Sequence, residues 1–112
     1  MMVAPSGPDL RMFVLDAMQD DIEDLASVMR YLVEWRSYWP HDFTEVEVLE
    51  ALKSLTEDAL VEVYEESPDS AELSPVESPS TDEASLRRYW FRPTARGKQM
   101  WKEWDAPSLP ES

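Results

Sequence analysis

The sequence predicts an α+β domain with a three-helix core, a two-stranded antiparallel hairpin and a short C-terminal helix. Apolar residues recur at helical spacing from residue 10 to residue 55. Two later segments, rich in β-branched and aromatic residues, flank a stretch of Ser, Pro and acidic residues. The chain has 112 residues and is 43% hydrophobic, so it has the size and the apolar content for one folded core.

Two helices are expected before residue 40, over about 9–19 and from about 22 to Trp35 or Tyr38. Asp9 is placed as the first N-cap, and Asp20 and Asp21 offer a break and a second cap. The apolar stripe of the first helix consists of Leu10, Phe13, Val14, Ala17 and Met18. A strand over 12–15 followed by one long helix is the competing interpretation, because periodicity does not assign a short apolar run. We favour two helices.

The third helix has the clearest start signal in the chain. Thr44 and Glu47 form a T-x-x-E capping box, with Phe43 and Val48 placed as a hydrophobic staple. The helix is expected to end near Asp58 and to pass into a strand over 60–64.

Residues 67–86 hold six Ser, three Pro and five acidic residues but no basic or aromatic one, which predicts a mobile acidic loop. A second strand is expected over 88–92, ended by Pro93, and Thr94 can cap a last helix through Trp104. The domain would thus span 9–105, with flexible ends over 1–8 and 106–112.

Two segments carry a resemblance to a known family. Leu49-Glu-Ala-Leu-Lys-Ser-Leu-Thr-Glu-Asp-Ala-Leu-Val-Glu-Val resembles the third helix and first wing strand of bacterial winged-helix regulators. Tyr89-Trp-Phe-Arg-Pro-Thr-Ala-Arg-Gly is similar to the second wing strand and turn of PadR-like and MarR-like families. With the element order, they resemble a winged helix-turn-helix domain, which implies that 67–86 is the wing loop. Gly97 either allows the last helix a close approach to the sheet or is a tolerated loop glycine.

The resemblance implies DNA contact through the third helix, but the residues there are mostly acidic. This helix-three surface consists of Glu45, Glu47, Glu50, Lys53 and Ser54. DNA carries a phosphate charge about every 1.7 Å along its axis, so three carboxylates in the groove would be repelled, and the net charge of −14 adds to the repulsion. We therefore expect a protein-interaction or adaptor module, with another protein as its partner.

One basic segment interrupts this acidity. Residues 87–102 hold six of the ten basic residues and no acidic one, and the alternative function is a transcriptional regulator that contacts DNA through the second wing strand and closing helix. The candidate interaction surface consists of Arg87, Arg88, Trp90, Arg92, Arg96 and Lys98. The Glu-rich strand across the hairpin could instead neutralise these charges within the chain. An acidic surface that mimics nucleic acid ranks below both functions, because no positional pattern supports it.

The chain contains few of the residue types that catalytic and metal sites commonly use. The chain has one His, no Cys and two Gly, which disfavours a catalytic His41, a thiolate metal site and a phosphate-binding glycine loop. We expect no enzymatic activity, no cofactor and no metal. No stretch predicts a signal peptide or membrane span, so a cytoplasmic protein without membrane contact is expected. Related families often dimerise through terminal helices, and the sequence leaves a homodimer open.

Overall fold

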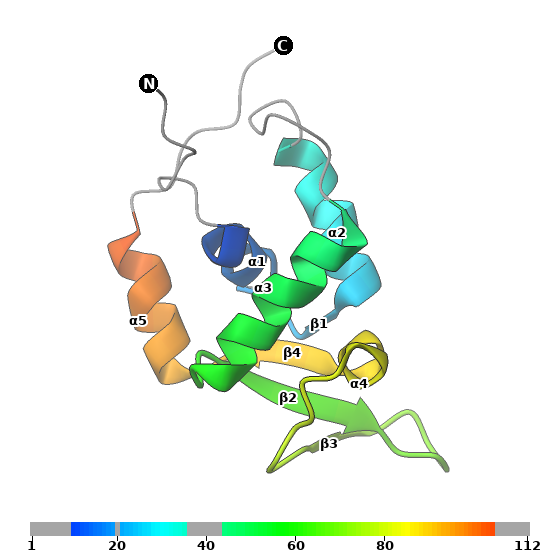
Figure 1. Ribbon diagram of the computed structural model, residues 1–112. Helices are drawn as coiled ribbons and strands as arrows, with labels where there is room; N and C mark the ends of the chain where they lie inside the picture. The colour runs from blue at the N-terminus through cyan, green and yellow to red at the C-terminus, as the bar shows by residue number, and fades with distance from the viewer. Residues whose placement is uncertain (1–9, 20, 36–43, 105–112) are drawn as a thin grey trace.

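Helices and an antiparallel sheet make up the part of the chain that the computed structural model describes, residues 10–19, 21–35 and 44–104 (Figure 1). The predicted α+β class is therefore confirmed. The elements in order are α1 (Leu10–Ala17), β1 (Glu23–Asp24), α2 (Leu25–Leu32), a 3-10 turn (Val33–Trp35), α3 (Glu45–Glu57), β2 (Val61–Glu66), β3 (Leu73–Pro75), α4 (Glu83–Arg88), β4 (Trp90–Pro93) and α5 (Ala95–Glu103). The predicted chain ends, Asp9, His41 and Phe43 lie outside the described residues.

The N-terminal part folds as two helices, and residues 12–15 are helical rather than a strand. All four side chains at 12–15 are buried, because α1 crosses the middle of the core. The predicted start of the second helix is wrong. Asp24 is its N-cap, and its Oδ1 atom accepts a hydrogen bond of 3.0 Å from the Ser27 N–H. The residues before it are extended because Glu23 and Asp24 pair with β4 as an edge strand.

Helix α3 follows its prediction closely. Thr44 Oγ1 accepts from the Glu47 N–H at 3.2 Å, and Glu47 Oε1 accepts from the Thr44 N–H at 3.0 Å, so the capping box is formed. The helix ends where Ala59 takes a left-handed φ of 58° and the Leu60 N–H reaches back to Leu55 O at 2.9 Å. Its core-facing side chains are Val48, Leu49, Ala51, Leu52 and Leu55.

The sheet is larger than predicted. Strands β2 and β4 pair antiparallel as expected, from Val61 opposite Pro93 to Tyr64 opposite Trp90. The prediction of a two-stranded hairpin is nevertheless wrong, because β1 and β3 join the outer edges and give the order β1-β4-β2-β3.

The predicted wing loop, residues 67–86, contains secondary structure of its own. The Ser67 N–H donates to Glu72 O at 2.9 Å and closes a turn from β2 into β3. Asp82 then caps α4, through a hydrogen bond of 2.8 Å from the Ser85 N–H to its Oδ1 atom. The second strand therefore begins at Trp90 and not at Arg88, since Arg87 and Arg88 form the last turn of α4.

Helix α5 returns to the core and packs close to the start of β2. Thr94 Oγ1 accepts from the Gly97 N–H at 3.0 Å and caps the helix as predicted. A Cβ atom on Gly97 would stand 2.1 Å from the carbonyl oxygen of Leu60, so the close-approach explanation of this glycine applies. Further along, Trp101 Nε1 donates to Asp16 Oδ1 of α1 at 2.8 Å.

The sheet has two unlike faces. Helices α1, α2, α3 and α5 lie on one side of it (Figure 1), where Val61, Val63 and Phe91 enter the core. The alternation along each strand turns the intervening residues to the other side. We call this side the outer sheet face; it carries Glu62, Tyr64, Glu66, Leu73, Pro75, Trp90 and Arg92.

Candidate interaction surfaces

The six residues of the predicted interaction surface lie on three different elements. Arg87 and Arg88 occupy the last turn of α4, where positive charge interacts favourably with the helix dipole. Trp90 and Arg92 lie on the outer sheet face, while Arg96 and Lys98 lie on α5. The segment is contiguous in sequence but is not one continuous patch in space.

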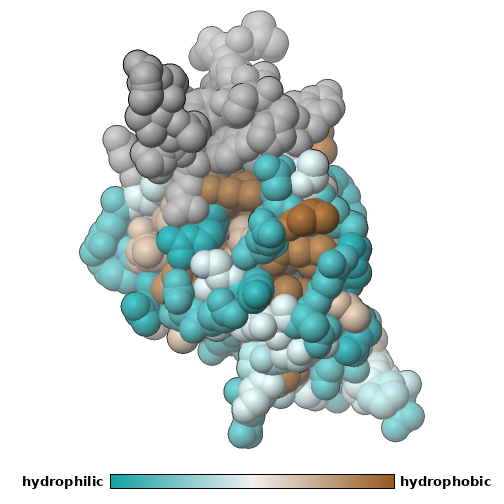
Figure 2. Space-filling model, viewed as in Figure 1, coloured by the Kyte–Doolittle hydropathy of each residue, from teal (hydrophilic) through white to brown (hydrophobic). Residues whose placement is uncertain are grey.

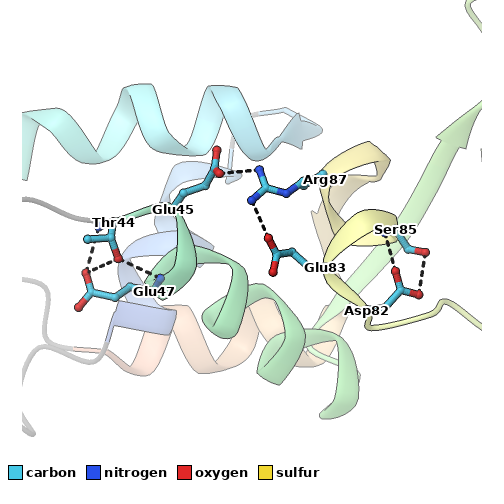
Figure 3. A network of polar contacts seen from close by, with 7 residues as sticks. All are labelled: Thr44, Glu45, Glu47, Asp82, Glu83, Ser85 and Arg87. Carbon is cyan, nitrogen blue, oxygen red and sulfur yellow. Dashed lines mark hydrogen bonds and ion pairs between the residues drawn. The ribbon is translucent and has the colours of Figure 1, made fainter.

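Arg87 joins two helices (Figure 3). Its Nη1 atom donates to Glu45 at the start of α3, and its Nη2 atom donates to Glu83 Oε2 of α4 at 2.7 Å. These two hydrogen bonds are the main reason that the pKa of the Arg87 guanidinium is raised. Two carboxylates of the same chain therefore balance this cation, and α4 is tied to the N-terminus of α3.

Arg92 is engaged on the sheet. Its Nη2 and Nε atoms donate to Glu62 Oε1 at 2.8 and 3.1 Å, and Nη2 also donates to the Tyr64 hydroxyl at 2.7 Å. The guanidinium carbon lies 5.3 Å from the centre of the Tyr64 ring, a cation–π distance. The hydrogen bond from Arg92 lowers the pKa of Glu62, while burial, followed by the bond to Glu62, raises the pKa of Tyr64. The charge of Arg92 is therefore neutralised by Glu62 of the Glu-rich strand β2.

The remaining basic residues have weaker contacts. Arg88 Nη2 donates to Ser85 Oγ at 3.5 Å, and Arg96 Nη1 donates to the Asp58 carbonyl at the end of α3 at 3.3 Å. Arg87, Arg88 and Trp90 share a hollow of about 360 Å³ with Asp24, Glu65 and Glu66. Arg92 and Lys98 line another of about 340 Å³ with Tyr64, Leu73 and Ile22 among its walls. The structure brings the predicted residues together in these two groups and leaves Arg96 apart.

The predicted helix-three surface is also divided. Glu45 binds Arg87, Glu47 belongs to the capping box, and Ser54 Oγ accepts from Arg11 Nη1 at 3.2 Å. Glu50 and Lys53 line a groove of about 300 Å³ between α3 and α4. Three of the five residues are thus used within the fold, and helix α4 lies beside α3.

Tyr64 is a surface residue that the sequence interpretation did not single out. It lies directly opposite Trp90 in the β2–β4 register, and both side chains are half-buried. With Arg92 beside them, they give the outer sheet face two large aromatic side chains and one arginine, the residue types enriched at protein interfaces. The alternation of Val61, Val63 and Tyr64 in a strand was a signal for this placement.

Helix α4 was missed because the composition of 67–86 outweighed a local signal. Asp82 and Ser85 have the spacing of an N-cap pair, and the helix begins with Glu83 and ends with Arg87 and Arg88. Hydrogen bonds from Ser80 and then Ser85 lower the pKa of Asp82. The acidic residues at the start of 82–88 and the basic residues at its end could therefore have predicted this helix from the sequence.

Within the described ranges 10–19, 21–35 and 44–104, no group of three or more His, Asp or Glu side chains is arranged to hold a metal ion. The helices of this part of the chain are also too short or too polar to cross a membrane. Comparison with protein-family models, curated proteins and solved structures finds no match for the chain.

Proposed function

We propose that the chain is a non-enzymatic, winged-helix-like module that binds another protein. The observation that carries this proposal is the engagement of Arg87 and Arg92 by carboxylates of the same chain. Three helices, the antiparallel β2–β4 pair and the closing α5 follow the element order of winged-helix domains and support the fold assignment. Fold does not determine function, so the argument rests on the surfaces.

The same contacts disfavour the alternative, a DNA-binding regulator. Binding to the DNA backbone requires Lys or Arg side chains that are available to pair with its phosphates. Arg87 and Arg92 would first have to leave Glu45, Glu83 and Glu62, which would then face the phosphates unpaired. The helix α3 surface adds Glu50, an exposed carboxylate that would also repel the phosphates.

The outer sheet face supports a protein partner. Trp90 and Tyr64 supply apolar area with polar tips, and Arg92 is held in place between Glu62 and the Tyr64 ring. An arginine whose geometry is already fixed loses less conformational entropy when a partner binds. These residues form the surface that we propose as the primary contact.

DNA binding by the purified protein separates the two functions. We expect no submicromolar binding to a random-sequence duplex at about 0.15 M salt, measured by fluorescence anisotropy. A regulator would instead bind with an affinity that falls steeply with salt and is lost on charge reversal at Arg88 and Arg92. Such a result would refute the proposal.

Affinity capture from the native host, with nuclease treatment, tests the protein partner. Proteins retained by the wild type should be lost with Trp90→Ser and kept with Arg30→Ser, an exposed substitution on α2. Circular dichroism must show that both variants are folded. Retention that depends on nucleic acid, or that is equal for both variants, would count against this surface.

A further inference from the structure

The groove between α3 and α4 has an apolar floor. Leu49 and Leu86 are buried at its base, and Val46 stands beside them with 57% of its surface exposed. Figure 2, in which α3 faces the viewer as in Figure 1, shows apolar surface on this side of the molecule surrounded by hydrophilic side chains. Among the described residues, the other exposed large hydrophobic side chains are Val33, at 51% exposure, and Met100, at 37%. Val46 adjoins a hollow of about 300 Å³.

The rim of this groove is acidic. Glu50, Asp82 and Glu83 line it, against a single cation, Lys53. Glu83 is shared with Arg87, so Glu50 and Asp82 supply most of the negative field. Asp82 accepts hydrogen bonds from Ser80 and Ser85, and these bonds lower its pKa. The apolar floor and the acidic rim define a complementary partner with apolar and basic side chains side by side.

We propose that the α3–α4 groove binds a short cationic amphipathic segment of another protein, with an aliphatic side chain against Val46 and Lys or Arg beside Glu50 and Asp82. A volume near 300 Å³ is at the low end for binding sites, so it admits one or two aliphatic side chains from one face of a helix. The net charge of −14 speeds the approach of such a segment. The inference deepens the proposed protein-binding function but uses a surface separate from Trp90.

A defined peptide probe tests the apolar part. The probe is a fluorescein-labelled peptide of about 14 Leu and Lys residues, patterned as an amphipathic helix, titrated with the full chain at about 0.15 M salt. Val46→Arg should weaken binding about tenfold or more. Val33→Arg, the same change at a valine with 51% exposure outside the groove, should change it less than about twofold.

A matched charge pair separates groove binding from general attraction to an acidic protein. Glu50→Lys and Glu65→Lys change the net charge equally, but only Glu50 lines the groove. We expect Glu50→Lys to weaken binding about fivefold or more and Glu65→Lys about twofold or less. Equal losses from both charge variants, equal losses from both valine variants, or no binding by the wild type would each overturn the inference. None of these outcomes bears on capture through Trp90, so failure of the groove is distinguishable from failure of the proposed function.

Discussion

Substitution of Gly97 by alanine should destabilise the protein, although alanine is the better helix former. The new Cβ atom would stand 2.1 Å from the Leu60 carbonyl oxygen, whereas side-chain Cβ contacts below 3.0 Å are essentially never found. Helix α5 or the residue before β2 must therefore shift by about 1 Å to restore contact. The obstacle is backbone, which cannot rotate away as a flexible side chain would.

The size of this effect follows from three contributions. Forced overpacking typically costs about 1–3 kcal/mol, and the shift also strains the 3.1 Å hydrogen bond from the Thr94 N–H to Leu60 O, which is worth about 1 kcal/mol. The higher helix propensity of alanine offsets about 1 kcal/mol of this loss in unfolding free energy. The net loss is therefore about 1–3 kcal/mol, or a fall in Tm of about 4–12 °C for a domain of this size.

Thermal unfolding followed by circular dichroism measures this loss, and position 99 provides the control. Gln99 is exposed on the same helix, so Gln99→Ala should be more stable than Gln99→Gly by about 1 kcal/mol. At position 97 the order of stability should be reversed, with glycine more stable than alanine. A Gly97→Ala protein that melts at or above the wild-type temperature would refute the close approach of α5 to Leu60.

Three further predictions concern stability. Thr44→Ala removes the cap oxygen of α3 and should cost about 1 kcal/mol in urea unfolding, while Thr44→Ser should retain most of it. Ala59→Gly should raise stability by about 0.5–1 kcal/mol, because it relieves a φ of 58° at the cost of a more flexible unfolded chain; a lower Tm would contradict this. The hydrogen bond from Arg92 holds the pKa of Glu62 below its ordinary 4.5, so its stabilising contribution is complete above the unfolded-state pKa and disappears as pH falls through the folded-state value. Glu62→Gln should therefore have a lower Tm than the wild type at pH 7, and the difference should shrink as the pH falls below 4.5; a difference of constant size across this range would argue against the Glu62–Arg92 pair.

Local sequence signals determined the elements that formed as predicted. The T-x-x-E box at Thr44 and Glu47 closes over three residues, and its hydrogen bonds are those expected from the spacing. Alternation in the segments around Val63 and Phe91 was sufficient to predict the antiparallel β2–β4 pair. Thr94 was likewise predicted from a local signal, and it caps α5 as expected.

The candidate surfaces depended on contacts that no local pattern encodes. Arg87 and Glu45 are separated by 42 residues, and their ion pair forms only because α4 packs beside α3. The two-residue strand β1 exists because β4 offers it a partner, and the Val46 groove exists because α4 forms its second wall. The sequence by itself therefore determined the α+β class, the caps of α3 and α5 and the central strand pair, since the cap hydrogen bonds join near neighbours and the strand pattern is local. Only the tertiary structure decided which arginines are neutralised and where apolar surface remains exposed, because both depend on which distant elements come into contact.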